Sequence, residues 1–102
     1  MEYSKDIATI FKALCDETRV SIILYLQTGE KCACTISRDL NIAQSKLSYH
    51  MKILCESGLV TSWYVGKWTH YRMSEEGFEH AMTILKELKQ CKLCETENGC
   101  HK

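Results

Sequence analysis

The apolar pattern of this chain changes its period at Gly58, and that change restricts the folds available to it. Before Gly58, apolar residues recur every three or four positions, as they do on the buried faces of α-helices. After it come two runs rich in β-branched and aromatic residues, LVTSWYV and WTHYRMS, on either side of the dipeptide Gly66–Lys67. Such runs around a tight turn predict a β-hairpin. We therefore expect a mainly α domain with one small β-hairpin.

Four helices are expected before the hairpin and one after it. Asp16 is the expected N-cap of the second helix, since its carboxylate can accept hydrogen bonds from free backbone amides. That helix should end near Gly29. A short third helix is expected from about Thr35 to Leu40, followed by a turn at Asn41–Ile42. The apolar side chains that these helices should bury are Ile7, Ile10, Phe11, Leu14, Val20, Ile23, Leu24, Leu47, Met51, Leu54, Phe78, Met82 and Leu85.

This order of elements, α-α-α-α-β-β-α, is typical of a winged helix-turn-helix, in which the hairpin is the wing. With 102 residues, the chain is expected to form one such domain over residues 1–90, followed by a polar, cysteine-rich tail over residues 91–102. The sequence has no run of 18 apolar residues and no apolar block near its start. These features predict a cytoplasmic protein without a membrane segment.

Charge is distributed unevenly along the chain, although its net charge is zero. Residues 38–72 carry five Lys or Arg against two acidic residues, and residues 75–97 carry six acidic residues against three Lys. A basic middle is a weak indication of DNA contact. No nucleophile with a neighbouring base and orienting group can be identified, and the Cys91–Cys94 pair follows a helix rather than a strand. An enzyme is therefore not expected.

The fourth helix is the second helix of the helix-turn-helix, and such a helix enters the major groove with its N-terminal residues facing the bases. Ala43 precedes this helix and is a poor N-cap. In the hairpin, four aromatic residues are expected to pack on the body of the domain, with at most one touching DNA: Trp63, Tyr64, Trp68 and Tyr71. The residues expected to contact DNA are Gln44, Ser45, Lys46, Ser48, Tyr49, His50 and Lys52 of the helix, and Lys67 and Arg72 of the hairpin.

Seven cysteines are a high count for a chain of this length. Cys32 and Cys34 lie just before the short third helix, where the helix N-terminus and the adjacent Lys31 should both lower a thiol pKa. Two thiolates on one soft centre must lie within about 4 Å of each other, but helical residues two apart point about 200° away from each other. The pair must therefore lie in an extended segment, or binding must distort the helix. Cys15 and Cys55 are expected to be small apolar core residues.

Three segments, FKALCDETRVSIILYL, CACTISRDLNIAQSKLSYHMKILCESGLV and GKWTHYRMS, resemble the ArsR/SmtB family of metal- and arsenic-responsive repressors. The likeness covers nearly everything from Phe11 to Ser74. It implies a homodimer, with the first and last helices at the interface, that leaves its operator when a thiophilic inducer binds. Cys32 and Cys34 match the cysteine pair of arsenic-responsive members. The residues expected at the dimer interface are Ile7, Ile10, Phe11, Phe78, Met82 and Leu85.

The resemblance leads to a functional hypothesis. The chain is expected to be a repressor of double-stranded operator DNA with no catalytic cofactor, and trivalent arsenic at Cys32 and Cys34 is expected to release it. Some relatives carry a third cysteine where this chain has Ser37. Two thiolates match a trivalent methylarsenical, whereas arsenite favours three sulfurs, so the pair either senses the methylarsenical at least as well or borrows a sulfur from the tail.

Two alternatives remain open at this point. The chain could respond to cadmium, lead or zinc through the same cysteines or through a secondary set formed by His80, Cys91, Cys94 and Cys100. The spacing of the first three is similar to the last-helix site of zinc-sensing relatives. Phe78 stands where those relatives carry an aspartate. A repressor controlled by thiol oxidation is the other alternative, although a disulfide between residues two apart is strained.

Overall fold

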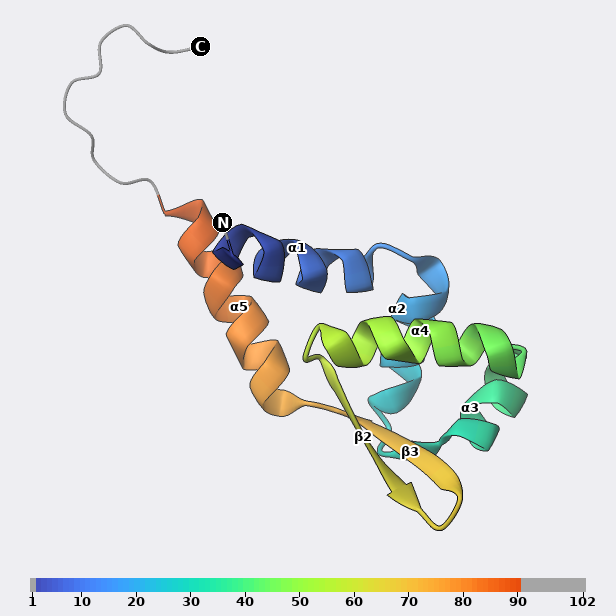
Figure 1. The fold of residues 1–102 in the computed structure, drawn as a ribbon. Helices are drawn as coiled ribbons and strands as arrows, with labels where there is room; N and C mark the ends of the chain where they lie inside the picture. The colour runs from blue at the N-terminus through green and yellow to red at the C-terminus, as the bar shows by residue number, and fades with distance from the viewer. Residues whose placement is uncertain (1, 91–102) are drawn as a thin grey trace, which may run out of the picture.

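The structure is a computed structural model that describes residues 2–90 (Figure 1). It confirms the expected winged helix-turn-helix and adds one short strand before the third helix. No helix among residues 2–90 is long and apolar enough to cross a membrane. In chain order the elements are α1 (Glu2–Leu14), α2 (Glu17–Leu26), β1 (Lys31–Cys32), α3 (Ala33–Leu40), α4 (Gln44–Glu56), β2 (Val60–Val65), β3 (Trp68–Met73) and α5 (Glu75–Lys89).

The hydrophobic core lies between α2, α3, α4 and the base of the hairpin. Ile36 of α3 is fully buried there, as is Leu59 where the chain leaves α4. The predicted apolar face of α4 is confirmed, because Leu47, Met51 and Leu54 are all at most 2% exposed. The opposite face of α4 is thereby directed outward.

The buried face of α2 differs from the prediction. Val20 and Leu24 are 38% and 56% exposed, and the helix buries Ile22 and Leu26 instead, together with Arg19 and the correctly predicted Ile23. The buried positions still follow the spacing i, i+3, i+4 and i+7 of an amphipathic helix. That stripe begins at Arg19. Because this residue is charged, the stripe does not appear as a run of apolar residues at helical spacing in the sequence.

Arg19 is buried because its guanidinium joins three helices. Its Nε and Nη2 donate hydrogen bonds of 3.0 Å each to the carbonyl oxygens of Ala13 and Lys12, which lie at the C-terminal end of α1. Its Nη1 lies 3.0 Å from Nδ1 of His50 in α4. The guanidinium can only donate, so Nδ1 must accept and the ring proton lies on Nε2. This network fixes α4 relative to α1 and α2.

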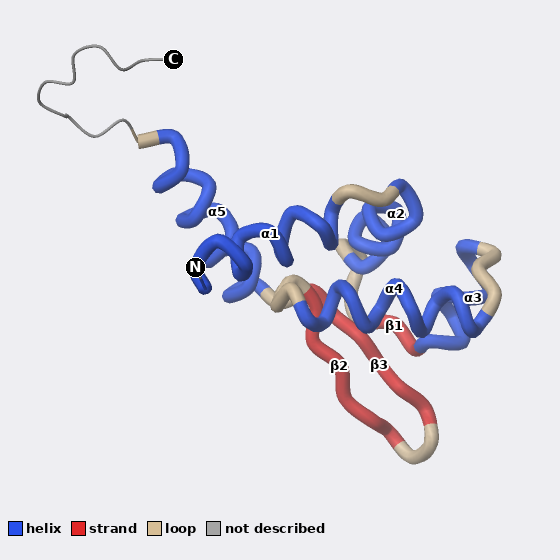
Figure 2. Tube along the Cα trace, turned by 45° about the horizontal axis from the view of Figure 1, so that its top comes forward, coloured by secondary structure: helices blue, strands red, loops and turns tan. Residues whose placement is uncertain are grey.

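The small sheet has the strand order β1-β3-β2, and both pairings are antiparallel. β2 and β3 meet at the predicted Gly66–Lys67 turn, with Val65 opposite Trp68. Gly66 has a φ of 65°, the backbone conformation that the first position of a tight hairpin turn requires. β1 is the unpredicted strand, and it pairs Cys32 with His70 of β3 (Figure 2). The segment that carries the first cysteine is thus part of the wing's sheet.

The helices differ in how they begin. The predicted cap of α2 is confirmed, since the Asp16 carboxylate accepts hydrogen bonds from the amides of Thr18 and Arg19 at 2.8 and 3.2 Å. Ser74 caps α5 in a similar way, through a hydrogen bond of 2.9 Å from the amide of Gly77. By contrast, Ala43 before α4 and Cys32 before α3 make no side-chain capping hydrogen bond. The two helices of the helix-turn-helix therefore start uncapped.

Candidate DNA-binding surface and cysteine pair

The outward face of α4 is polar along its length. Tyr49, whose side chain ends in a hydroxyl, is 59% exposed on this face. The uncapped first turn of α4 also leaves backbone amides free, and such amides favour anions such as phosphate. Apart from His50, all the predicted DNA-contacting residues of this helix are exposed: Gln44, Ser45, Lys46, Ser48, Tyr49 and Lys52.

His50 was predicted to reach DNA, but it is only 8% exposed and its Nδ1 faces Arg19. Its ring edge also packs against Tyr49, with the ring centroids 5.3 Å apart. The side chain is therefore committed to the interior, and we assign it to holding α4 in place rather than to contacting DNA. The burial of His50 could not be predicted from the local sequence, because its partner, Arg19, is 31 residues away.

The wing carries the two predicted cations, Lys67 and Arg72, in exposed positions. The Lys67 ammonium lies 5.5 Å from the centroid of the Trp68 ring, and the Arg72 guanidinium lies 5.6 Å from that of Trp63. Cation–π contacts of this kind hold long side chains over aromatic faces. Both cations are thus held against the hairpin and remain accessible to phosphates.

The aromatic residues of the wing follow the prediction only in part. Tyr71 packs against the hydrophobic core as expected, and Trp63 stacks on the ring of His70 with centroids 5.9 Å apart. Tyr64 and Trp68 are 77% and 47% exposed, so they do not pack the hairpin on the body of the domain. The hairpin extends beyond the helices (Figure 1), so the end that carries these two side chains packs little against the body of the domain.

A cleft of about 220 Å³ separates the start of α4 from the wing. Gln44 and Ser48 line it from α4, and Lys67, Trp68 and Thr69 line it from the hairpin side. Polar groups, a cation and an indole thus share one continuous surface with the exposed face of α4. This surface can accept a sugar-phosphate backbone beside a helix in the major groove.

The cysteine pair lies where the wing's sheet joins the helix-turn-helix. Cys32 is in extended backbone, with φ −78° and ψ 149°, and Cys34 is in the first turn of α3. This helix begins two residues earlier than predicted, so the pair straddles the junction of strand and helix. The two Sγ atoms are 3.1 Å apart, and one thiol donates a hydrogen bond to the other. Both sulfurs can therefore reach one soft centre without any distortion of the helix.

The surroundings of Cys32 favour its thiolate. The Cys34 thiol lowers the pKa of Cys32 from its ordinary value, and the backbone amides of Cys34 and Thr35 at the start of α3 lower it further. Lys31 was predicted to lower the pKa of Cys32 as well, but it is not among the causes of the shift. Its ammonium instead donates to Thr28 Oγ1 at 2.6 Å and to the Gly29 carbonyl at 3.0 Å. The helix N-terminus and the partner thiol account for the shift.

The other two cysteines of the described chain differ from this pair. Burial raises the pKa of Cys55, which is half-buried beside the core as expected of a small apolar residue. Cys15 was predicted to be a core residue, but it is exposed at the junction of α1 and α2. It lies immediately before the N-cap Asp16, in the turn between two helices rather than on a buried face.

Around the pair, α3 makes mainly exposed or half-buried polar contacts. The Tyr25 hydroxyl of α2 donates to the carboxylate of Asp39, which also pairs with Arg38 at 2.9 Å. Ser37 donates a hydrogen bond of 2.6 Å to the Ile42 carbonyl in the turn. Asn41 takes a φ of 55° there. The serine thus closes the turn between α3 and α4.

The predicted secondary metal set cannot be assembled from the described residues. His80 is exposed on α5, and Cys91, Cys94 and Cys100 lie outside residues 2–90. Within that range, no three His, Cys, Asp or Glu side chains are placed to hold a metal ion together. The pair Cys32–Cys34 is accordingly a two-ligand site as far as the structure describes the chain.

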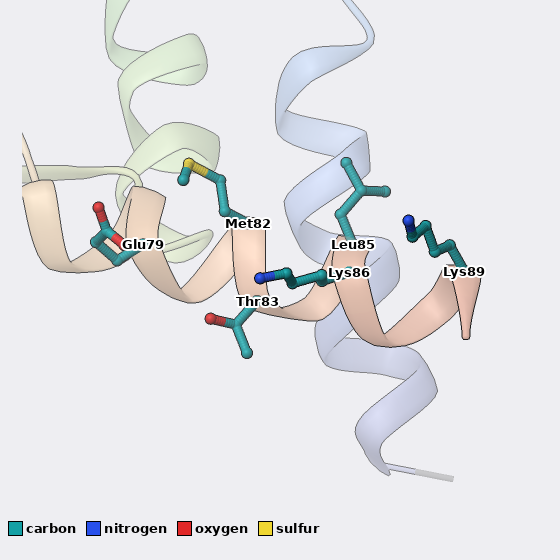
Figure 3. Close-up of a pocket in the computed structure, with 6 residues that line it drawn as sticks. All are labelled: Glu79, Met82, Thr83, Leu85, Lys86 and Lys89. Carbon is teal, nitrogen blue, oxygen red and sulfur yellow. The ribbon is translucent and has the colours of Figure 1, made fainter.

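The predicted dimer residues divide into two groups. Ile10 is only 5% exposed, and Phe78 packs partly against the core, so both contribute to the interior of one chain. Phe11, Met82 and Leu85 are 42%, 57% and 53% exposed. Met82 and Leu85 line a shallow hollow of about 450 Å³ on α5, which Figure 3 shows together with the neighbouring polar side chains. Ile7 is half-buried.

Comparison with known proteins places this arrangement in a family. Residues 16–62 match the family described as "Bacterial regulatory protein, arsR family". Over 83 residues the chain is 42% identical to the arsenical resistance operon repressor of Escherichia coli K12, an alignment that covers 80% of this chain and 71% of that protein. This chain belongs to the ArsR family. It is thus a DNA-binding transcriptional repressor and not an enzyme.

Solved structures agree with the ArsR-family fold. An ArsR-like transcriptional regulator from Rhodococcus sp. RHA1 superposes with a TM-score of 0.76 at 26% identity, covering 86% of this chain and 83% of that one. A homodimeric winged helix-turn-helix domain from Mycobacterium bovis superposes with a TM-score of 0.71 at 20% identity, covering 99% of this chain and 91% of that one. The predicted fold class is therefore confirmed for this ArsR-family member.

Proposed function

We propose that this ArsR-family repressor binds operator DNA as a homodimer and releases it when trivalent arsenic binds Cys32 and Cys34. The observation that carries the proposal is the pair of Sγ atoms 3.1 Å apart at the junction of the wing and the helix-turn-helix. The name of the Escherichia coli relative, an arsenical resistance operon repressor, supports the choice of inducer.

In the proposed complex, α4 lies in the major groove with its polar face toward the bases, and Lys67 and Arg72 of the wing contact phosphates. This assignment rests on the exposure of those residues and on the cleft that links α4 to the wing. The buried Arg19–His50 contact gives α4 a fixed orientation on the domain.

The homodimer is supported by the exposed apolar side chains of α1 and α5. Phe11, Met82 and Leu85 are joined by Tyr3 and Leu88, which are 50% and 54% exposed. Removing such side chains from water provides about 25 cal/mol for each Å² of apolar surface. Two copies joined through α1 and α5 would bury these faces against each other and present two recognition helices to a two-fold related operator.

Two thiolates are a ligand set for soft centres rather than for magnesium or calcium. Because residues 2–90 offer no third ligand at the pair, the arrangement fits a trivalent methylarsenical, which has two positions for thiolates. Arsenite would need a third sulfur from beyond residue 90. We therefore expect the methylarsenical to act at least as well as arsenite.

Release is proposed to follow from the position of the two sulfurs in different elements. Cys32 belongs to β1, which pairs with strand β3 of the wing, whereas Cys34 belongs to α3, which packs beside α4. A centre held by both sulfurs fixes the angle between the wing and the helix-turn-helix. An angle that differs from the one on DNA would weaken binding of the wing and α4 together.

Fluorescence anisotropy on a duplex from the chain's own promoter region tests this proposal. Reduced protein is titrated with arsenite, a trivalent methylarsenical, cadmium and zinc, using wild type, Cys32→Ser, Cys34→Ser and the control Cys15→Ser. Release of wild type and the control by arsenicals, but not of the other two variants, is expected. Release of all four proteins by cadmium or zinc would place the sensor outside the pair. Release by peroxide without metal would favour thiol oxidation.

A further inference from the structure

The tip of the wing is unusually apolar for a solvent-exposed turn. Tyr64, Val65 and Trp68 are 77%, 51% and 47% exposed within five consecutive residues. Exposed apolar groups gathered in this way mark interaction surfaces more often than free surface. The charge at this tip is that of Lys67, whose ammonium lies over the Trp68 ring.

The fold leaves about half or more of each of these side chains exposed. Both views show the hairpin extending past the helices, with its tip on the far side from α5 (Figures 1 and 2). A dimer formed through α1 and α5 would therefore leave the tip exposed. Val65 and Trp68 are cross-strand partners on one face, and Tyr64 lies on the other, so the turn is apolar on both sides.

The tip is continuous with the DNA-binding surface. Trp68 and Lys67 line the cleft whose opposite wall is formed by Gln44 and Ser48 of α4. When α4 lies in the major groove, this cleft receives the adjacent sugar-phosphate backbone. Beyond that backbone a duplex presents its minor groove, and the tip of the hairpin, which extends past the helices, is the part of the protein that would reach it.

We propose that Tyr64, Val65 and Trp68 form an apolar wedge that enters the minor groove of the operator and opens a base step. This inference rests on the proposed binding of operator DNA. Apolar side chains inserted from the minor groove partly unstack the bases and kink the duplex toward the major groove. Lys67, in the turn between Val65 and Trp68, lies beside the wedge and neutralises neighbouring phosphates.

A protein partner fits the tip less well. A large aromatic side chain buries at most about 250 Å², so the three residues supply about 600 Å² even when fully covered. A stable protein–protein interface needs about 800 Å² from each partner. A narrow groove would contact both faces of the hairpin at once. It would therefore cover the apolar side chains on both faces without the area that a protein interface needs.

The test compares wild type with Tyr64→Ala/Val65→Ala on a promoter-region duplex. Leu24→Ala is the control, because Leu24 is an apolar residue of α2 whose exposed fraction, 56%, lies between those of Val65 and Tyr64. Three quantities are measured: affinity against salt, DNA bend from energy transfer between end labels, and the emission of 2-aminopurine placed at successive steps. Wild type should bend the duplex and raise the emission at one step in each half-site. The double variant should lose both signals and about tenfold in affinity.

The salt dependence separates a wedge from a phosphate contact. The double variant should keep the wild-type slope of log affinity against log salt, whereas Lys67→Ala should lower that slope by about 1. Unchanged affinity, bend and emission in the double variant would overturn the wedge while leaving the proposed function intact. A change in oligomeric state with an unchanged bend would overturn it in favour of a second copy. Failure of wild type to bind the duplex would overturn the proposed function as well.

Discussion

The helices that hold the domain together and the helices of the helix-turn-helix begin in opposite ways. Asp16 and Ser74 close the first turns of α2 and α5 with side-chain hydrogen bonds. Cys32 and Ala43 leave the first turns of α3 and α4 without one. A missing cap costs about 1 kcal/mol, so the two uncapped helices are the less stabilised pair.

This difference in capping shows that the backbone amides at the start of a helix can either stabilise the helix or bind a ligand. Amides satisfied by a side chain are unavailable to a ligand, and the first turns of α3 and α4 keep theirs free. At α3 those amides favour the thiolate of Cys32, and at α4 they face the proposed DNA. Four predictions test this contrast.

The largest effect is expected from Arg19→Ala in the capped helix α2, because it removes three hydrogen bonds, two of them buried. The carbonyls of Lys12 and Ala13 and the ring of His50 would lose their partner. The free energy of unfolding should fall by about 3 kcal/mol. Urea denaturation measures it, and Lys52→Ala, which removes an exposed pair with Glu56, should change it by less than about 0.5 kcal/mol. Equal losses in the two variants would contradict the role of the network.

A smaller effect is expected when a cap is added to α4. Ala43→Ser should raise the free energy of unfolding by about 1 kcal/mol, because the hydroxyl can accept from an amide that has no partner now. The change corresponds to a rise in Tm of about 4–8 °C for a domain of this size. Ala43→Val offers no acceptor and should give no gain. A gain in both variants would point to apolar packing instead of capping.

The variants Cys32→Ser and Cys34→Ser should differ in stability, although neither should bind the inducer. Cys32→Ser places a hydroxyl at the N-cap of α3 and should raise the free energy of unfolding by about 0.5 kcal/mol. Cys34→Ser lies inside the first turn and should not raise it. Thermal unfolding of the two proteins, with and without a methylarsenical, measures both properties. A stabilised Cys34→Ser would show that loss of the thiol pair, rather than capping, governs stability here.

The most subtle effect is a difference in thiol reactivity. The pKa of Cys32 is lowered by the Cys34 thiol and the α3 amides, and that of Cys55 is raised by burial. At neutral pH a larger fraction of Cys32 is therefore thiolate, and iodoacetamide should modify it several times faster than Cys55. Peptide mass spectrometry at a series of pH values gives both rates. If Cys32 and Cys55 were modified at similar rates at every pH, the expected difference between their pKa values would be contradicted.

Much of the fold followed from patterns within one segment of sequence. The Asp16 cap, the apolar face of α4 and the Gly66–Lys67 turn each depend on residues a few positions apart, and each is confirmed. The structure also places both sulfurs within chelating distance, which was one of the two arrangements that the spacing allowed. The homodimer, the DNA contacts and the inducer remain predictions.

What the sequence could not reveal depends on residues that are distant along the chain. The burial of His50 requires Arg19, and the pairing of Cys32 with His70 joins positions 38 residues apart. Both were missed because no local period connects such residues. The exposure of Tyr64 and Trp68 was missed for a similar reason, since the composition of the hairpin does not show how far it extends beyond the helices.

The row of Cys32, His70 and Trp63 across the sheet has a practical consequence. The whole chain contains two tryptophans, Trp63 and Trp68, and both lie in the wing. Trp63 stacks on His70, whose neighbour in the next strand is the first cysteine of the pair. The tryptophan emission of the protein therefore originates entirely in the wing, so the unlabelled repressor carries its own optical probe of what happens at Cys32.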